Sequence, residues 1–345
     1  MNFHIAMLLG QDGMTNGAIY ALLALSILLV FSVTRILLIP QGEFVTYGAL
    51  TMASVQSGQP TALIWLLLGL TLIDCLLDLR AALGSSQRRR LPLRALIKLG
   101  YALLLALLIK TLPLAQLPMA VQALLTLALV APLGPLIYRL AFQSIASANS
   151  LVLLIVSIAV HVSMVGIGLL LFGPEGARTR PFSEQGLDLG PVTFNSQTLW
   201  VLAVSLGLII GLYLFFGRSL YGKALRATAV NRMGARLMGI SPSLAGQSTF
   251  FLAALIGTLS GILIAPITTL YFDSGFIISL KGFVGAIIGG LASYPLAAIG
   301  ALGVGLVEAF SMFWASTYKE IIVFTLIIPC LLWRSLTHRH VEEEE

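Results

Sequence analysis

The amino-acid sequence predicts an all-α protein, a polytopic bundle of transmembrane helices. Of its 345 residues, 58% are hydrophobic and only 10% are charged, whereas a soluble domain carries about 25% charged residues. The mean hydropathy is +0.98. Nearly uncharged stretches recur along the chain, each close to the roughly 20 residues that cross a bilayer core of about 30 Å. Because strand-type alternation is absent, helices in lipid are favoured over an outer-membrane barrel.

Eleven apolar segments are expected, of which about eight to eleven enter the membrane. Two of them, 43–57 and 279–293, are short and rich in small residues, which predicts re-entrant or broken helices. The whole chain, 1–345, is expected to form one transmembrane domain. Within it, 80–115 looks like an insertion with a basic loop, 217–242 is a further basic loop, and 336–345 is a disordered, solvated tail. The segments are 14–34, 43–57, 61–79, 95–112, 117–138, 150–172, 198–216, 244–271, 279–293, 296–316 and 320–335.

The positions of lysine and arginine predict the orientation. Stretches with basic residues and no acids lie between 80 and 98 and between 217 and 242. Cytoplasmic loops carry an excess of such residues, so both are expected in the cytoplasm, whereas the mixed-charge connection 173–197 fits the outer side. Counting segments places the N-terminus outside and the C-terminus inside. The net charge of +6 arises largely in these loops and does not indicate nucleic acid. No cleavable signal pattern precedes the first apolar segment, which is expected to be retained.

An internal symmetry is a further prediction. A long apolar segment followed by a short glycine-containing one occurs twice, as 14–34 with 43–57 and as 244–271 with 279–293. In the segment count the two pairs run in opposite directions across the membrane. Short or glycine-interrupted segments at corresponding places are typical of transport sites built from inverted repeats.

No nucleotide or metal site is expected. Residues 217–224 match the P-loop pattern except at the last position, where Ala224 replaces the Ser or Thr that holds Mg²⁺. The stretch also follows a predicted transmembrane helix rather than a strand. Cys75 and Cys330 lie in apolar runs without metal-ligand spacing and are interpreted as buried hydrophobes. The chain is therefore expected to have no cofactor and no ATPase site of its own.

The stretch from 217 to 240 has two interpretations that the pattern alone leaves open. It is basic, amphipathic and long enough for two short helices, and it ends before Ser241-Pro242. It is either a positively charged loop lying on lipid headgroups or a docking element for a cytoplasmic partner.

Ionisable residues inside apolar segments are expensive and usually face a bundle interior or a watery path. Glu308 is interpreted as a helix–helix hydrogen-bonding residue or a residue of a transport path, and Glu43 as an interfacial cap or a path residue. Asp74 and Asp78 are expected to pair with the basic cluster that follows them. His161 is expected to pack or to form a hydrogen bond rather than to bind a metal.

Glycines near the C-terminal end form a small-residue surface. Such surfaces let helices approach closely in lipid, and they also allow a helix to break beside a substrate path; close packing is the preferred interpretation. The residues are Gly282, Gly285, Gly289, Gly290, Gly300, Gly303 and Gly305.

Several motifs, in order along the chain, resemble those of the branched-chain amino acid ABC transporter permeases. The family's cytoplasmic loop reads approximately G-x-A-L-R-A, then a polar residue, then A-x-x-x-G-I, and residues 222–240 are similar to it. The resemblance extends from about residue 16 to 332, is interrupted near 71–115, and departs at 38–41, where the family usually has Asn-Phe-Ala-His. The other similar segments are 16–25, Gly42-Glu43-Phe44, 171–174, and 281–291 with Pro295, Gly300, Gly303 and Glu308.

The resemblance implies a permease subunit in a bacterial-type inner membrane. Its partners would be cytoplasmic ATPase subunits that use ATP, a second permease subunit (identical or related) and an extracytoplasmic binding protein. The residues that would contact the ATPase are Arg226, Asn231, Ala235, Gly239 and Ile240. The candidates for the translocation path are Gln41, Gly42, Glu43, Tyr47, Gly289, Gly290 and Glu308.

The function expected from these observations is import of branched-chain or other hydrophobic amino acids. Two alternatives stay open: an ABC permease for urea, a short amide, a sugar or a nucleoside, and an ion-coupled secondary transporter. The latter needs a carboxylate cluster at the midplane, for which Glu308 is the single candidate in the sequence. A membrane enzyme is disfavoured because no polar catalytic constellation is visible.

Overall fold

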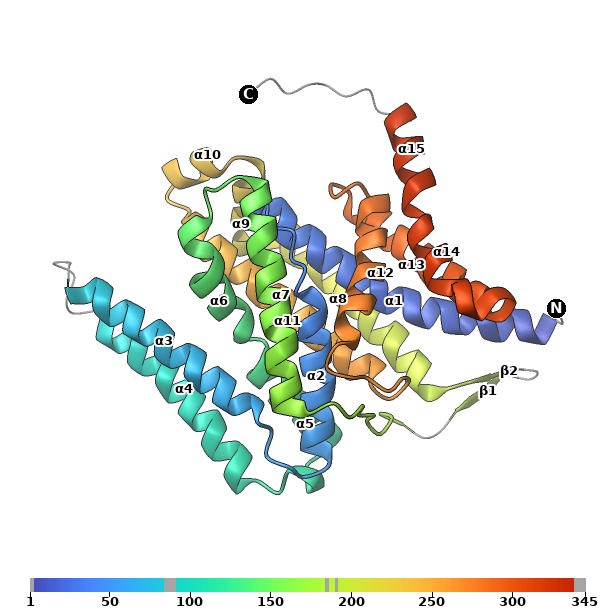
Figure 1. Ribbon diagram of the computed structural model, residues 1–345, viewed down its shortest axis with the longest axis horizontal. Helices are drawn as coiled ribbons and strands as arrows, with labels where there is room; N and C mark the ends of the chain where they lie inside the picture. The colour runs from blue at the N-terminus through green and yellow to red at the C-terminus, as the bar shows by residue number, and fades with distance from the viewer. Residues whose placement is uncertain (1–2, 84–90, 184–185, 190–191, 338–345) are drawn as a thin grey trace. The chain divides into compact units, whose positions relative to one another are not determined.

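The computed structural model describes residues 3–83, 91–183, 186–189 and 192–337 (Figure 1). These residues divide into two compact units that each draw on several parts of the chain. The first contains residues 1–28, 183–212 and 277–345, and the second contains 29–182 and 213–276. The prediction of one permease domain over 1–345 stays a prediction. The basic residues 88–90 and the tail 338–345 lie outside the described residues.

Helices account for nearly all of the described structure, which confirms the all-α class. An antiparallel hairpin of two three-residue strands, which the sequence did not predict, pairs Leu187 with Phe194 and Leu189 with Val192. The helices are α1 Phe3–Thr34, α2 Gln41–Gln56, α3 Leu63–Leu83, α4 Leu91–Thr111, α5 Met119–Val130, α6 Leu133–Ile137, α7 Ser150–Phe172, α8 Ser196–Arg218, α9 Leu220–Val230, α10 Arg232–Leu237, α11 Pro242–Ile264, α12 Ser274–Ile288, α13 Tyr294–Ala315, α14 Lys319–Thr325 and α15 Ile327–Thr337; the strands are β1 Leu187–Leu189 and β2 Val192–Phe194.

Each of the eleven predicted segments contains helix, and several differ in extent. The first begins at Phe3 rather than 14, and the eighth ends at Ile264 rather than 271. The segment 117–138 is interrupted after Val130, beside Pro132, because proline lacks the backbone N–H that continues a helix. It then continues through a π-helical turn, η2 (Tyr138–Phe142). The segment 320–335 divides between α14 and α15.

Six helical stretches among the described residues are long and apolar enough to cross a membrane. The two segments predicted to be re-entrant or broken are short helices without a break, since α2 has 16 residues and α12 has 15, and their re-entry stays a prediction. Helices α3 and α4 have suitable lengths of 21 residues but carry charged side chains. The protein is therefore a helical membrane protein, as its composition predicted.

In the second unit, α2 packs directly on α11. Glycine makes this possible, because a Cβ at Gly261 would lie 2.0 Å from the Val45 carbonyl oxygen, and a Cβ at Gly48 would lie 2.7 Å from the Thr258 carbonyl oxygen. Close backbone approach of this kind holds helices together in lipid, where apolar burial alone does not. On another side, the Tyr47 hydroxyl of α2 donates to the Met164 carbonyl of α7 at 2.7 Å.

We expect Gly261→Ala to destabilise the protein, because the added methyl group overlaps the α2 backbone and overpacking costs about 1–3 kcal/mol. The matched control is Gly166→Ala in α7, where a Cβ meets no atom within 4 Å and helix propensity improves by roughly 0.5–1 kcal/mol. Thermal unfolding of both variants in detergent, followed by fluorescence-detected gel filtration, checks this. Equal melting temperatures would contradict the close α2–α11 contact.

In the first unit, α1 packs on α13 through glycines of both helices. A Cβ at Gly17 would lie 2.9 Å from Leu302 Cα, and one at Gly305 would lie 2.4 Å from Gly17 Cα. Helix α12 approaches α13 in the same way, since a Cβ at Gly285 would lie 2.5 Å from the Ala301 side chain. The glycine-rich C-terminal surface is thus used for close packing, as preferred from the sequence.

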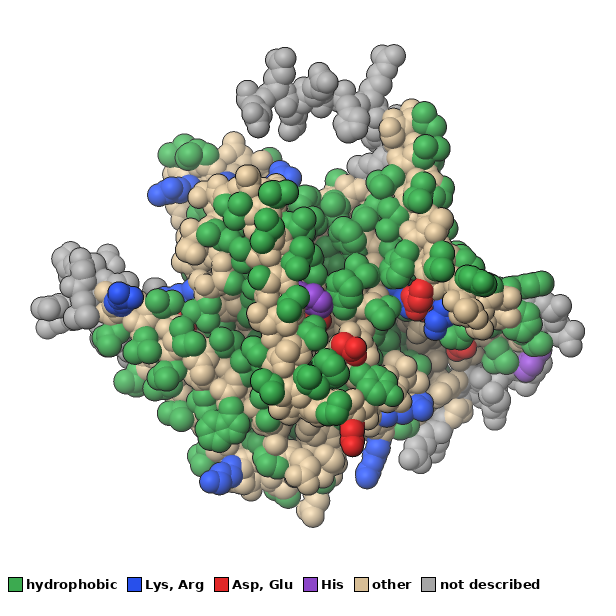
Figure 2. Space-filling view, in the orientation of Figure 1, with side chains coloured by type: hydrophobic (Ala, Val, Ile, Leu, Met, Phe, Trp, Pro, Cys, Tyr) green, Lys and Arg blue, Asp and Glu red, His purple; other side chains and the backbone are tan. Residues whose placement is uncertain are grey.

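Helices α3 and α4 form a hairpin in the second unit (Figure 1). Its outer face is apolar and exposed, as Figure 2 shows, and includes Leu72, Leu76, Leu103 and Leu107. Exposed apolar surface of this extent fits contact with lipid. The opposite side of the hairpin carries Asp74, whose side chain is 1% exposed.

Candidate functional site

The first turn of α2 follows a non-helical segment that tight contacts hold in place. Helix α1 ends at Thr34. The next residue, Arg35, has a φ of 61° in the left-handed region, and its N–H donates to the Phe31 carbonyl at 2.8 Å. The Ser157 hydroxyl of α7 then donates to the Leu37 carbonyl at 2.7 Å and accepts from the Ile39 N–H at 3.0 Å. The stretch that departs from the family motif is therefore fixed to α7.

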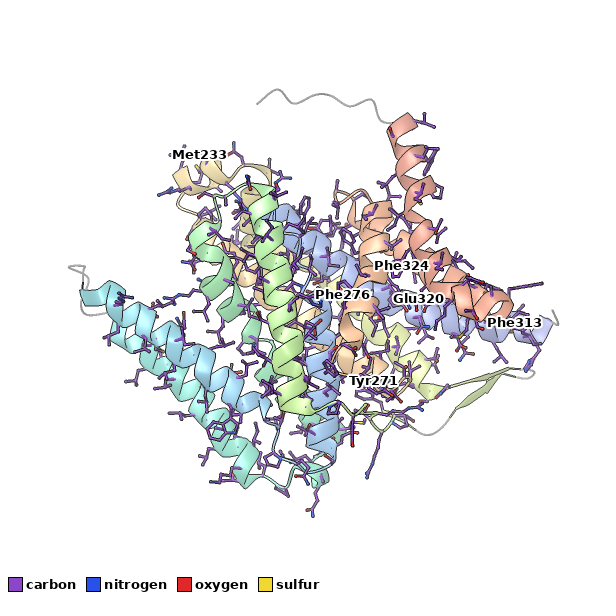
Figure 3. All side chains as sticks on the ribbon, in the orientation of Figure 1. Met233, Tyr271, Phe276, Phe313, Glu320 and Phe324 are labelled. Atoms are coloured by element: carbon purple, nitrogen blue, oxygen red, sulfur yellow. The ribbon has the colours of Figure 1, made fainter. Side chains whose placement is uncertain are left out.

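Glu43 lies in this first turn and is completely buried. Its Oε1 atom is 3.1 Å from Nδ1 of His161 on α7, whose side chain is 14% exposed. The His161 ring stacks on Phe276 with centroids 4.6 Å apart and an interplanar angle of 28°. Figure 3 labels Phe276 near the start of α12. The structure thus places a carboxylate, an imidazole and an aromatic ring in one cluster.

The other path candidates on α2 are also buried. Gln41 donates from Nε2 to the Ala253 carbonyl of α11 at 3.0 Å. A Cβ at Gly275 would lie 2.1 Å from the Gly42 carbonyl oxygen, so the start of α12 contacts this turn directly. Tyr47 joins α2 to α7 through its hydroxyl. The path candidates on α2 therefore lie together in its N-terminal part, at Gln41, Gly42, Glu43 and Tyr47.

Gly289 and Gly290 form the end of α12. The Gly290 N–H donates to the Ile287 carbonyl at 2.7 Å, and the Leu291 N–H donates to the Ala286 carbonyl at 3.0 Å. This is the Schellman arrangement, which requires a residue in the left-handed region, and Gly290 has a φ of 64°. Both glycines lie in the first unit, and their local role is to close the turn between α12 and α13.

Glu308 of α13 belongs to a buried charged cluster in the first unit. Its Oε2 accepts from the Tyr20 hydroxyl at 2.6 Å, and its Oε1 lies 2.5 Å from Nζ of Lys281. The Lys281 ammonium also lies 3.1 Å from Glu320 of α14, which Figure 3 labels. The predicted helix–helix hydrogen bond is therefore confirmed. The sequence did not predict the Glu308 partner Lys281, which is 5% exposed.

The segment 217–242 contains two short helices, α9 and α10, as its length allowed. Side-chain caps begin each of them: Ser219 accepts from the Gly222 N–H at 2.9 Å, and Asn231 accepts from the Gly234 N–H at 2.8 Å. Such caps satisfy backbone N–H groups that have no partner within the helix. The P-loop-like stretch therefore connects two helices, whereas a P-loop connects a strand to a helix.

Three residues of the loop motif define the end of α10. The Gly239 N–H donates to the Arg236 carbonyl at 3.1 Å and the Ile240 N–H donates to the Ala235 carbonyl at 2.9 Å. Gly239 has a φ of 81°, where an L side chain is strained. Ala235 is 4% exposed. The motif Ala-x-x-x-Gly-Ile is thus the sequence of a helix C-terminus with a Schellman motif.

Two arginines attach this segment to neighbouring helices of the second unit. Arg226 is exposed and donates to the Phe216 carbonyl at the end of α8. Arg232 donates to the Val33 carbonyl of α1 at 3.0 Å and to the Ala146 carbonyl before α7 at 3.3 Å. Burial lowers the pKa of the Arg232 guanidinium, which remains charged because the ordinary value is far above neutrality.

The same segment exposes large apolar side chains beside its basic ones. Their exposed fractions lie between 66% and 86%. Figure 3 labels one of them, Met233, on α10. A capped, anchored helix pair with an exposed apolar surface is suited to contact with another protein. The residues are Val230, Met233, Leu237 and Met238.

Three features of these sites were not predicted from the sequence: the role of Lys281, the partners of His161 and Arg232, and the exposed apolar side chains of α10. Lys281 was visible inside an apolar segment, and a lysine at such a position signals a buried acidic partner. His161 was expected to pack or to form a hydrogen bond, but its partner Glu43 and the Val33 partner of Arg232 gave no signal, because they are distant in the chain. The exposed methionines and leucines of α10 have the composition of a lipid-facing helix.

Comparison with known proteins identifies the family. A family model described as branched-chain amino acid transport system / permease component matches residues 91–331. The permease protein BraD of the high-affinity branched-chain amino acid transport system of Pseudomonas aeruginosa is 27% identical over 211 residues, covering 58% of this chain and 68% of BraD.

Other relatives match over shorter shares of their length. LivH of Escherichia coli is 32% identical over 145 residues, 41% of this chain and 46% of LivH. A probable LivH of Methanocaldococcus jannaschii is 25% identical over 212 residues, 58% of this chain and 65% of that protein. This chain thus matches about half of the E. coli relative and just under two thirds of the archaeal one. Among solved structures, PsaBC from Streptococcus pneumoniae in complex with Fab gives a TM-score of 0.38 at 10% identity, covering 95% of this chain and 91% of that chain. Because the family model spans more than half of the residues, the chain belongs to the branched-chain amino acid transport system permease components.

Proposed function

We propose that the chain is the membrane-embedded permease subunit of an ATP-driven importer for branched-chain or other hydrophobic amino acids. Family membership and the described transport role of the relatives support the substrate class. Separate ATPase subunits hydrolyse ATP on the cytoplasmic side. A binding protein delivers the substrate at the outer face, and a second permease subunit completes the pore.

The observation that carries this proposal is the construction of the segment 217–242, which we call the coupling segment. Its basic charge favours the cytoplasmic side, and this supports the proposal that the N-terminus lies outside and the C-terminus inside a bacterial-type inner membrane. Helix α10 exposes Met233 and Leu237, and the residue after it, Met238, is also exposed, while the caps of α10 and Arg232 hold the helix in place. A rigid apolar surface of this kind fits a groove on a cytoplasmic ATPase better than it fits a flexible headgroup layer.

The contacts of Arg232 supply a route from the coupling segment to the membrane interior. Its guanidinium holds the Val33 carbonyl at the end of α1, and the next residues, held by Ser157, lead into the first turn of α2. Movement of α10 would therefore act on Gln41 and Glu43 through a short, hydrogen-bonded connection. In this way ATP-driven closure of the partner switches access to the path.

We expect the double substitution Met233→Asp/Leu237→Asp to abolish coupling, because two carboxylates replace exposed apolar contacts and hot-spot truncations at interfaces cost about 2 kcal/mol or more each. Leucine uptake into proteoliposomes that contain all subunits should fall at least about tenfold, and the ATPase subunits should no longer copurify. Met233→Leu, which keeps the surface apolar, is the matched control. Normal uptake by the double variant, or uptake by this chain without any ATPase, would refute the proposal.

A further inference from the structure

The cluster around Glu43 holds polar atoms that are buried and lack hydrogen-bond partners. Among the described residues, Oε2 of Glu43 and the Thr46 hydroxyl make no hydrogen bond, and Oε1 of Glu43 faces Nδ1 of His161 at 3.1 Å without forming one. Glu43 and Thr46 are 0% exposed. They are three residues apart on α2 and therefore share one face of the helix. The Gly275 backbone closes over this face, since a Cβ there would lie 2.3 Å from the Thr46 hydroxyl oxygen.

Such a combination is unusual in a folded protein. Buried polar groups are nearly always hydrogen-bonded, and an ionised carboxylate without partners is costly. The carboxylate of Glu43 offers about four acceptor positions. The His161 imidazole lies near only one of its oxygens, with Nδ1 3.1 Å from Oε1. The unfilled positions indicate that a donor-rich group completes the cluster during the working cycle.

The chemistry of the cluster selects the kind of group. The described residues contain no set of three or more His, Cys, Asp or Glu side chains able to hold a metal ion. An alkylammonium group carries one positive charge and three donors, which matches two carboxylate oxygens and one hydroxyl. The aromatic pair of His161 and Phe276 adds an apolar and π-electron surface beside the carboxylate.

We propose that Glu43, together with Thr46 and His161, binds the α-ammonium group of the transported amino acid. This inference rests on the proposed function, and it assigns the ammonium group of the substrate to a binding site in the permease. Phe276 covers the site and lies at the point where the chain leaves the second unit, since the first unit resumes at Ile277. Separation of the Phe276 and His161 rings opens the site.

The experiment uses the transporter with all its membrane and ATPase subunits in lipid nanodiscs, without binding protein. Binding of radiolabelled leucine at millimolar concentration is measured by equilibrium dialysis, in competition with isoamylamine, which has only the ammonium group, and 4-methylpentanoate, which has only the carboxylate. Wild type should bind leucine, and isoamylamine should compete better than 4-methylpentanoate.

Glu43→Gln keeps the shape and removes the charge, so leucine binding should weaken about tenfold or more and the competition by isoamylamine should be lost. Thr46→Val leaves the charge in place and should weaken binding about threefold to tenfold. The matched control is Thr51→Val, because Thr51 is also buried on α2 with an unpartnered hydroxyl but is not in this cluster. It should bind leucine as wild type does.

Three outcomes would overturn the inference: no leucine binding by wild type, wild-type binding by folded Glu43→Gln, or equal losses in Glu43→Gln and Thr51→Val. Gel-filtration profiles and melting temperatures establish that each variant is folded; if Glu43→Gln is not, the Thr46→Val and Thr51→Val pair decides. ATP-driven leucine uptake by the complete wild-type system is measured in parallel. Uptake with unaltered binding by the site variants refutes this site alone, whereas absence of uptake refutes the proposed function.

Discussion

Lys281→Met should lower the stability of the protein by about 3–5 kcal/mol, because it leaves the Glu308 carboxylate buried with the Tyr20 hydroxyl as its remaining partner. The side chains of Lys281 and Glu308 are 6% and 7% exposed, so water does not replace the lost ammonium group. Glu320 is 37% exposed and can be hydrated. A large drop in melting temperature of the detergent-purified chain checks this prediction.

The double variant Lys281→Met/Glu308→Gln separates two roles of the pair. Removing both charges should restore most of the stability, because the glutamine carbonyl still accepts from Tyr20 and no unpaired charge remains. If Glu308 also lines the translocation path, the stable double variant will import leucine poorly. If the pair only joins α1, α12 and α13, import returns with stability. A single Lys281→Met variant that melts like wild type would contradict the buried ion pair.

Much of the fold could be predicted from sequence because lipid imposes a simple rule: an apolar stretch of sufficient length becomes a helix. All eleven predicted segments contain helix. The prediction failed where hydropathy carries no signal. The break at Pro132, for example, lies within a run of uniform hydropathy. The β1–β2 hairpin was missed because three-residue strands are too short for alternation to show.

Candidate functional residues could be named from the sequence only where they belong to a local sequence motif. Asn231, Ala235, Gly239 and Ile240 were named together because they match the family's loop motif, and the structure gives their spacing a local reason in capping and Schellman geometry. Their positions are explained by local backbone geometry, while contact with an ATPase stays a prediction. Long-range pairs were less accessible, since Glu43 meets His161 only through the packing of α2 against α7.

The charged side of the α3–α4 hairpin contains one contact that could be predicted from the sequence and one that could not. Asp74 and Asp78 were expected to pair with the basic cluster, and Lys98 of α4 lies 2.6 Å and 3.1 Å from them. Arg139 in η2, which contacts both aspartates, could not be predicted from the sequence. This arginine connects α3 to the remainder of the second unit, so the hairpin is attached to its unit by charge.

Arg139→Met should therefore loosen the hairpin and destabilise the protein by about 3 kcal/mol, because two buried aspartates are left with the single ammonium of Lys98. Asp74 is 1% and Asp78 is 11% exposed, whereas Lys98 is 36% exposed. Cys75 reports on the change, since it lies beside Asp74 and its Sγ is 3.5 Å from the Ala95 carbonyl of α4. With Cys330 replaced by serine, maleimide should label Cys75 faster in the variant.

Two comparisons show whether the effect comes from the charge cluster. Arg218→Met removes an exposed arginine of α8 and should change neither the melting temperature nor the labelling rate, because exposed charges contribute about 1 kcal/mol or less. Arg139→Met/Asp78→Asn returns the cluster to one acid and one base and should recover most of the stability. If Arg139→Met labels and melts like Arg218→Met, the hairpin is held by apolar contacts with α6 and α5 instead, and the ion network is not what attaches it.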